Sequence, residues 1–264
     1  MLVTGAGRGI GKRLAIGLAK NGFRIGLLGR HKGELDSTKL EIEDNRGFAE
    51  SYKADVRDLD QVEAAVAAMT NQMGPIHALI ANAAVLGPVG PFAQTDPRRW
   101  ADVLQTNVTG VLNSCRAVLP VMLGRRCGKI VVISGQGACS PRPGFAVYAA
   151  SKAAVAMFVE SLADEVRDHN VQVNSMFPGE AYTSMTDEIL GARNTVSAHE
   201  LEHAENVRMT GGISPEKQTQ LAMFLISERS NHLTGKMIHV QDDWKRLEQD
   251  NCRMDGYTIR RHAR

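Results

Sequence analysis

The sequence contains few cysteines, no long run of one charge and no long apolar run. Its four cysteines, among 264 residues, are scattered and never form a C-x-x-C pair, which excludes a disulfide framework or a zinc ribbon. The net charge of +2 arises from nearly balanced acids and bases, so nucleic-acid binding is disfavoured. No apolar run approaches the roughly 18 residues that a membrane span needs. We therefore expect no nucleic-acid partner, no membrane association, and free thiols at Cys115, Cys127, Cys139 and Cys252.

The composition is that of a folded α/β protein. With 43% hydrophobic residues the chain has ample material for a buried core, and its length suits one large domain. The first residues enter an apolar strand and a glycine-rich turn directly, without a secretory segment ahead of them. We expect a soluble, cytoplasmic protein.

Short apolar segments with strand character alternate with longer helical segments along the chain. This alternation predicts a parallel sheet, and right-handed crossovers place helices on both of its faces. A continuous apolar run such as Ile130–Ile133 fits a strand that is covered on both sides. We predict a doubly wound, Rossmann-type α/β fold of about seven strands, at Met1–Thr4, Phe23–Leu28, Phe48–Lys53, Ile76–Ala81, Lys129–Ser134, Val171–Phe177 and Lys236–Val240. The predicted helices are Gly9–Asn21, Lys32–Asn45, Leu59–Met73, Pro97–Leu123, Tyr148–Asp168 and Pro215–Glu228.

Residues 1–241 are expected to form a single domain. Two segments of the chain depart from the alternation of strands and helices. Between Pro178 and Gly212 the chain is polar and partly helical. Residues 180–212 are therefore predicted to form an insertion, either a mobile lid over a substrate site or a surface excursion without a role in binding. Residues 242–264 form a charged tail, for which a disordered terminus is the alternative.

A glycine-rich turn, Thr4–Gly11, stands where the first strand gives way to the first helix. Gly5, Gly9 and Gly11 let the chain turn sharply and bring backbone N–H groups of the helix start close to a pyrophosphate. The spacing is T-G-x-x-x-G-x-G, with Ile10 where the G-x-G-x-x-G fingerprint has its third glycine. The turn therefore predicts a dinucleotide site.

Tyr148 and Lys152 are one helical turn apart, so their side chains share a helix face. A nearby ammonium favours the phenolate, and we expect Lys152 to lower the pKa of Tyr148 toward the range where proton transfer is efficient. Ser134 ends an apolar strand fourteen positions before Tyr148, and its hydroxyl can hydrogen-bond a reacting oxygen. Together with Asn107, these residues predict acid–base chemistry on a carbonyl or an alcohol.

In order and separation, these features resemble the short-chain dehydrogenase/reductase family, of the type with T-G-x-x-x-G-x-G and Y-x-x-x-K motifs. The resemblance covers residues 1–241 and implies an oxidoreductase that interconverts a carbonyl and a secondary alcohol with a nicotinamide cofactor. It implies that Tyr148 exchanges the proton, that Ser134 stabilises developing alkoxide charge, and that Asn107 holds a proton-relay water. The implied partners are a small-molecule substrate and further copies of the chain, in a homo-dimer or homo-tetramer whose residues 244–264 cover a neighbour's site.

The resemblance also assigns cofactor contacts beyond the glycine turn. The family sets the pair Asp55 and Val56 against the adenine ring, and it places a segment like Pro178–Thr183 beside the nicotinamide. The implied cofactor set is Gly5, Arg8, Gly9, Ile10, Gly11, Arg30, Asp55, Val56, Asn82, Ala83, Tyr148, Lys152, Pro178, Gly179 and Thr183, without a metal. The chain departs from the family pattern at Val85, Ala181 and Gln241–Trp244, where a glycine, a branched aliphatic residue and a D-G-G-like turn are usual.

The choice of cofactor depends on the end of the second strand. An acidic residue there would accept hydrogen bonds from the ribose and repel a 2′-phosphate, but this chain has Leu28-Gly29-Arg30-His31. Arg8 and Arg30 match the two positions at which NADPH-dependent relatives hold the phosphate, and guanidinium groups suit phosphate oxygens. We predict NADP(H), with NAD(H) as the alternative if Arg30 only caps local backbone or is solvated.

Two hypotheses from other functional classes compete with this one. The segment His199–His203 satisfies H-E-x-x-H, which on a helix would present two imidazoles to zinc and Glu200 to a water, as in a zinc peptidase. It lies in the polar insertion and lacks the H-x-x-G-x-x-H continuation, which favours solvated or lid residues instead. The second hypothesis is a sensor that binds NADP(H) without turnover, against which the complete set of catalytic residues argues.

Overall fold

The computed structural model describes residues 1–248 and 257–258 of the chain. Its strands are β1 (Leu2–Thr4), β2 (Arg24–Gly29), β3 (Phe48–Lys53), β4 (Ala78–Ala81), β5 (Gly128–Ile133), β6 (Val171–Phe177) and β7 (Met237–His239). They form one seven-stranded parallel sheet in the order β3-β2-β1-β4-β5-β6-β7. The predicted doubly wound parallel fold is therefore confirmed.

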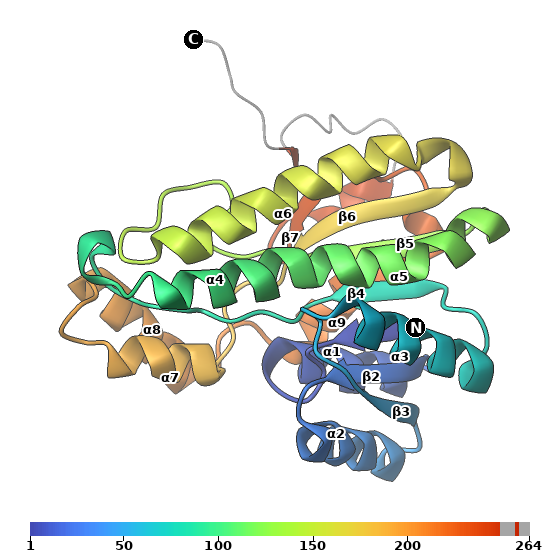
Figure 1. The fold of residues 1–264 in the computed structure, drawn as a ribbon, viewed down its shortest axis with the longest axis horizontal. Coiled ribbons are helices and arrows are strands. Elements are labelled where there is room, and N and C mark those ends of the chain that lie inside the picture. The colour runs from blue at the N-terminus through green and yellow to red at the C-terminus, as the bar shows by residue number, and fades with distance from the viewer. Residues whose placement is uncertain (249–256, 259–264) are drawn as a thin grey trace.

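Helices cover both faces of this sheet (Figure 1). The α-helices are α1 (Gly9–Lys20), α2 (Lys32–Asp44), α3 (Leu59–Met73), α4 (Arg98–Leu104), α5 (Gly110–Arg125), α6 (Ala146–Glu165), α7 (Ser184–Gly191), α8 (Ala198–Thr210) and α9 (Pro215–Ile226). One face packs against α3, α5 and α6, and the other packs against α1, α2 and α9. Helices α7 and α8 lie together at one end of the molecule (Figure 1).

Burial of both sheet faces explains why the strands are continuously apolar. Successive residues of a strand point to opposite faces. In β5, Ile130 and Val132 join the core on the α3, α5 and α6 side, while Val131 and Ile133 join the core on the other side. All residues of β5 are buried, so none of its positions can be polar without a partner.

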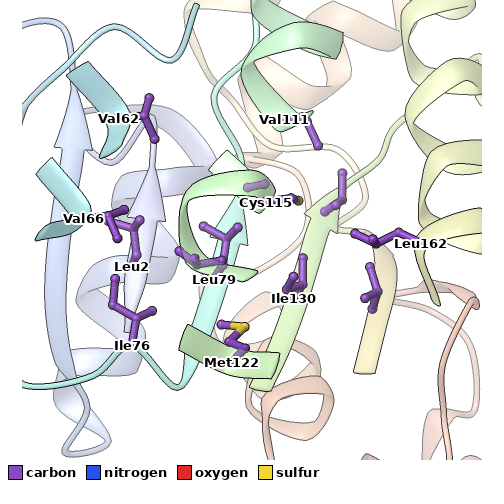
Figure 2. Packing of buried hydrophobic residues seen from close by; sticks show 14 of the residues in the cluster. Leu2, Val62, Val66, Ile76, Leu79, Val111, Cys115, Met122, Ile130 and Leu162 are labelled. Carbon is purple, nitrogen blue, oxygen red and sulfur yellow. The ribbon is translucent and has the colours of Figure 1, made fainter. Parts of the chain in front are cut away.

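The core on the α3, α5 and α6 side contains one of the cysteines. Figure 2 shows Leu79 and Ile130, on adjacent strands, close to Cys115 on α5. Cys115 behaves there as a small apolar residue, with its thiol free and buried. Free thiols are confirmed at Cys115, Cys127 and Cys139, and Cys252 lies outside the described residues.

The predicted helix Pro97–Leu123 is interrupted in its middle. Helix α4 ends at Leu104, α5 begins at Gly110, and the turn between them, Gln105–Thr109, is π-helical. A π turn inserts an extra residue and so changes the face that each following side chain presents. Asn107 lies in this turn and is 1% exposed. Apolar spacing does not mark the interruption, because the polar groups that bond Asn107 come from distant segments.

Helix α6 passes the length and composition test for a membrane span. It has 20 residues, and its most apolar 18-residue stretch has a mean hydropathy of 1.3, with 39% of that stretch buried inside the protein. Its buried residues include Val155 and Val159, which belong to the core beneath the helix. Ser151, Lys152 and Glu160 interrupt its apolar residues, so the helix does not stand out in the sequence as an unbroken apolar run. A helix that covers a buried sheet face is itself largely apolar.

The two atypical segments both contact the domain. The insertion 180–212 forms α7 and α8, whose Ile189, Leu190 and Ala204 share a small core with Leu86 and Phe145. Within the tail, Trp244 stacks on Phe224 of α9 with ring centroids 5.1 Å apart, and Leu247 is fully buried. This part of the tail therefore packs on its own domain. The prediction for residues 249–256 and 259–264 falls outside the described residues.

Close packing of α1 on α9 depends on Gly17. A Cβ atom at Gly17 would lie 2.1 Å from Oγ1 of Thr219 and 2.9 Å from its Cγ2. We expect Gly17→Ala to lower the free energy of unfolding by about 1–3 kcal/mol, because overpacking outweighs the better helix propensity of alanine. Urea denaturation measures the change. The matched control is Gly124→Ala in α5, where no atom lies within 4 Å of the added Cβ. Equal stability of the two variants would contradict this account.

Candidate active site

A cleft of about 180 Å³ opens at the carboxyl ends of the strands. Strand order reverses between β1 and β4, and in open α/β sheets such a switch point is where ligands bind. The cleft is lined from both sides of this point, by the glycine turn and by the loop after β4. Of the predicted site residues, it brings together Gly5, Arg8, Gly9, Ile10, Arg30, Val56, Asn82, Ala83, Ser134, Tyr148, Lys152 and Thr183.

The glycine turn is shaped by positions that have no room for a side chain. Gly5 and Gly9 have φ angles of +64° and +57°, in the left-handed region that favours glycine. A Cβ atom at Gly11 would lie 2.3 Å from the carbonyl oxygen of Gly5 and 2.4 Å from Nδ2 of Asn82. Gly11 therefore lies under the turn and does not line the cleft, whereas α1 begins at Gly9 with its first N–H groups at the cleft.

Thr4 and Asn82 join the ends of β1 and β4. Thr4 Oγ1 accepts hydrogen bonds from the backbone N–H groups of Asn82 and Ala83 at 3.0 and 3.1 Å. Nδ2 of Asn82 donates to the carbonyl oxygens of Thr4 and Gly5 at 3.0 and 3.3 Å. Thr4 is 1% exposed and was not predicted as a site residue, although it begins the glycine motif. These bonds fix the separation between the ends of β1 and β4 at the switch point.

Basic side chains gather at the end of the cleft beside β2. Arg8, Arg30 and His31 line it, and both arginines are exposed. Among the described residues, neither guanidinium forms an ion pair with a carboxylate. Glu34, in the first turn of α2, lines the same end and was not predicted. The only sign in the sequence that Glu34 lines the cleft is its position four residues after Arg30.

Three predicted cofactor contacts, Asp55, Pro178 and Gly179, do not line this cleft. The carboxylate of Asp55 does not line the cleft, since it accepts hydrogen bonds from Nε and Nη2 of Arg57 at 3.0 and 2.7 Å. The guanidinium of Arg57 outweighs partial burial and lowers the pKa of Asp55. Only Val56 of that pair reaches the cleft. Pro178 and Gly179 instead line an adjoining cavity of about 130 Å³.

Tyr148 and Ser134 line both cavities and meet at their boundary. A Cβ atom on Gly135, the residue after Ser134, would lie 3.2 Å from the hydroxyl oxygen of Tyr148. Ser134 is 3% exposed, and among the described residues its hydroxyl has only the sulfur of Met237, a weak acceptor at 3.6 Å, as partner. Two side chains with hydroxyl groups therefore line the region that the two cavities share.

Lys152 is buried one helical turn from Tyr148. Its Nζ donates to the carbonyl oxygen of Ile133 at 2.9 Å and lies 5.6 Å from the centroid of the Tyr148 ring. Burial lowers the pKa of Lys152 to about 8. Burial also raises the pKa of Tyr148, and the charge of Arg142 opposes this only in part. The net direction for Tyr148 is thus opposite to the expected lowering of its pKa, because desolvation dominates.

Asn107 is bonded on all sides and does not line the cleft. Its Nδ2 donates to the carbonyl oxygen of Val85 at 2.9 Å and to Oγ of Ser151 at 3.0 Å, and its Oδ1 accepts from the N–H of Val85 at 2.8 Å. Ser151 Oγ in turn donates to the carbonyl oxygen of Tyr148 at 2.6 Å. Ser151 is fully buried and was not predicted. It links the π turn to the helix that carries Tyr148 and Lys152.

The insertion contributes to both cavities. Ser184, Met185 and Glu188 at α7 line the cleft, and His203 and Val207 of α8 line the adjoining cavity. The insertion therefore contacts the site, and its role in binding and its mobility remain predictions.

The H-E-x-x-H segment lies on α8, but its glutamate is already engaged. Glu200 accepts hydrogen bonds from Nε and Nη2 of Arg142 at 3.0 and 2.9 Å. The ring centroids of His199 and His203 are 6.5 Å apart. In the described ranges, no group of three or more His, Cys, Asp or Glu side chains could hold a metal ion. The geometry therefore gives no support to a zinc peptidase.

Known proteins of similar sequence have the chemistry that this geometry suggests. Residues 1–194 match the short chain dehydrogenase family. The chain is 36% identical over 243 residues to gluconate 5-dehydrogenase of Gluconobacter oxydans, covering 90% of this chain and 91% of that protein. It is 31% identical over 237 residues to 2,3-dihydro-2,3-dihydroxybenzoate dehydrogenase of Bacillus subtilis, covering 88% and 90% of the two chains.

A solved structure agrees with these relatives in fold. A variant of actinorhodin polyketide ketoreductase, crystallised with NADPH, superposes with a TM-score of 0.82 at 31% identity, covering 90% of this chain and 94% of that one. The family match over residues 1–194 spans the glycine turn, the π turn and the helix of Tyr148 and Lys152. The chain therefore belongs to the short-chain dehydrogenase/reductase family and is an oxidoreductase.

Proposed function

We propose that the protein is an NADP(H)-dependent oxidoreductase that interconverts a carbonyl and a secondary alcohol, with Tyr148 as the general acid and base. The observation that carries the proposal is that Ser134, Tyr148 and Lys152 line the same cleft as the glycine turn. A dinucleotide extended along this cleft could therefore place its pyrophosphate at the glycine turn and its nicotinamide at Ser134, Tyr148 and Lys152.

The residues of the cleft fit a nicotinamide dinucleotide. Glycines at positive φ leave the start of α1 open to a pyrophosphate, and nothing but Thr183 lies within 4 Å of a Cβ atom placed on Gly9. Val56 offers an apolar surface for an adenine, and Thr183 lines both this cleft and the adjoining cavity, as Tyr148 and Ser134 do. Such a cofactor, when bound, supplies or accepts the hydride.

The side chains of the chain itself handle the proton. Burial keeps Tyr148 protonated at neutral pH, so that its hydroxyl can donate a proton to a carbonyl oxygen during reduction. Ser134, whose hydroxyl has no strong partner, can donate a hydrogen bond to the same oxygen. Both donors of the Asn107 side chain are engaged, so a proton-relay water near Lys152 would be held by the main chain of the π turn.

Two exposed guanidinium groups support NADP(H) over NAD(H). Arg8 and Arg30 stand at the end of the cleft beside β2, where a 2′-phosphate would lie, and each can bind phosphate oxygens in a bidentate manner. Glu34 lines the same end and would oppose a phosphate. NAD(H) is the second candidate on the strength of that carboxylate.

Assembly and location follow from family resemblance and remain predictions. We infer a homo-dimer or homo-tetramer, since Leu112 of α5 and Met157 of α6 are exposed apolar side chains on the two long helices. A cytoplasmic location is the corresponding expectation. Sedimentation velocity measures the assembly.

Titration of NADPH and NADH into the protein tests the cofactor. We expect NADPH to bind more tightly, and Arg30→Asp to weaken NADPH binding about tenfold to a hundredfold because a charged hydrogen bond is lost and a repulsive charge gained. Nicotinamide fluorescence reports binding. Arg125→Asp, the same change at the end of α5, which lies just before the start of β5 and does not line the cleft, serves as control. Preference for NADH by the parent would favour NAD(H), and binding of neither cofactor would refute the dinucleotide site.

Replacement of the tyrosine hydroxyl separates an enzyme from a sensor. We expect Tyr148→Phe to lower kcat for ketone reduction by about two to four orders of magnitude while NADPH affinity is retained. The control is Tyr52→Phe on β3, whose hydroxyl donates to Gln72 at 2.9 Å away from the cleft. Tight NADPH binding by the parent without turnover of a broad ketone panel would support the sensor hypothesis instead.

The buried ammonium of Lys152 makes folding depend on pH. Its pKa falls from 10.5 to about 8 on folding, so between these values the unfolded chain retains a proton that the folded chain has lost, and stability rises with pH across that window. At neutral pH the buried charge costs roughly 3 kcal/mol. We therefore expect Lys152→Met to be more stable than the parent at pH 7, and inactive.

Lys129 provides the matched control for this effect. It is 8% exposed, burial lowers its pKa to about 8, and its Nζ donates to Oδ1 of Asn231 at 2.7 Å, away from the cleft. Lys129→Met is expected to gain less stability, because it also loses that bond, and to keep its activity. Thermal unfolding from pH 7 to 10 measures both. A Lys152→Met variant whose stability follows the parent's pH dependence would contradict the assignment.

A further inference from the structure

The cavity adjoining the cleft contains polar groups that the chemistry at Tyr148 and Ser134 does not use. Gln136 follows β5, Glu180 follows β6, and His203 lies on α8, so three separate segments bring them together. Nε2 of Gln136 donates to Oε1 of Glu180 at 3.2 Å. Nε2 of His203 lies 3.6 Å from the same carboxylate oxygen, beyond hydrogen-bonding distance.

His203 therefore holds a polar atom that needs a partner. Its Nε2 is buried and has no hydrogen-bond partner among the described residues. Buried polar atoms without partners are rare and unfavourable, and many such atoms in functional sites are satisfied by a ligand. The unpartnered nitrogen lies beside a carboxylate in a cavity that also contains Tyr148.

A hydroxyl group matches this pair of atoms better than other ligand groups. It donates its one hydrogen to the carboxylate of Glu180 and accepts from the Nε2–H of His203, the tautomer that the neighbouring carboxylate favours. A carbonyl or ether oxygen cannot donate to the carboxylate. An anionic group would be repelled by Glu180. An ammonium group has no lone pair to accept from His203 in the tautomer whose Nε2 carries the hydrogen.

The only arginine that lines this cavity in the described part of the chain is occupied. Arg142 forms a two-bond pair with Glu200, both side chains being less than 15% exposed, and its guanidinium lies 4.0 Å from the centroid of the Phe145 ring. A substrate carboxylate would have to break this pair. The pair also fixes α8 to the loop after β5, and so holds His203, three residues after Glu200, against the cavity.

We propose that the substrate is an uncharged hydroxy ketone, or the diol formed from it, whose second hydroxyl is bound by Glu180 and His203. The reacting oxygen lies at Tyr148 and Ser134, and Gln136 positions Glu180 through its hydrogen bond. Glu180 and His203 are thus specificity-determining residues. The inference rests on the proposed function, because it names the substrate class of the same site.

Matched ketones test the inference. With NADPH-loaded enzyme, kcat/KM is measured for cyclohexanone, for its hydroxylated isomers, and for its amino and carboxylate derivatives. We expect the preferred hydroxylated isomer to exceed cyclohexanone by about tenfold to a hundredfold, as for a hydrogen bond to a charged group. In Glu180→Leu and in His203→Phe the ratio should fall toward one while cyclohexanone is still reduced.

The control is His199→Phe, which changes an exposed histidine one turn earlier on the same helix and should keep the ratio. A merely structural effect of the two variants would lower the rates for all ketones alike and leave the ratio unchanged, which would overturn the inference. So would a parent enzyme that binds NADPH and prefers cyclohexanone, the amine or the carboxylate, or that reduces none of them. Failure of the parent to bind NADPH overturns the proposed function itself, and fluorescence titration detects that outcome separately.

Discussion

The junction between β1 and β4 is the constraint on which the rest of the site depends. Thr4 and Asn82 bond the ends of these strands to each other, and the glycines of the turn have no side chain that could force them apart. Because the two loops diverge from this point to opposite faces of the sheet, they leave a cleft between them. The start of α1 and the loop carrying Val85 are both positioned by these bonds, and Val85 in turn is bonded by Asn107.

From this junction, hydrogen bonds extend to the chemical groups. Asn107 bonds Val85 on one side and Ser151 on the other, and Ser151 bonds the backbone of Tyr148. The side chains of Asn107 and Ser151 are buried, and their polar atoms have partners, so the network orients the helix of Tyr148 and Lys152. Lys152 is the exception, since its charge is buried against a single carbonyl oxygen and its pKa falls to about 8. A destabilising residue at this position is typical of a functional site.

The insertion connects the reaction to substrate choice. Its helices bury Ile189 and Leu190 against the domain, and the pair of Arg142 with Glu200 anchors α8 over the second cavity. Glu200 is thus a structural residue, which explains an H-E-x-x-H segment in a protein without the geometry of a zinc peptidase. Its neighbour His203 is left with an unpartnered nitrogen facing Glu180. On α8, Glu200 therefore anchors the helix, and His203, three residues later, faces the substrate cavity.

The sequence alone determined the elements whose local physics is strong. Alternating apolar strands and helices predicted the doubly wound sheet, because such strands must be covered on both faces, and the glycine turn and the Tyr148–Lys152 spacing identified the cleft and family. Only the tertiary structure decided what depends on distant neighbours. It placed Asp55 on Arg57, interrupted a helix at Asn107, raised the Tyr148 pKa, and set His203 beside Glu180. Hydrogen-bond partners and desolvation depend on residues far apart in the chain. The local spacing of residues in the sequence therefore cannot predict them.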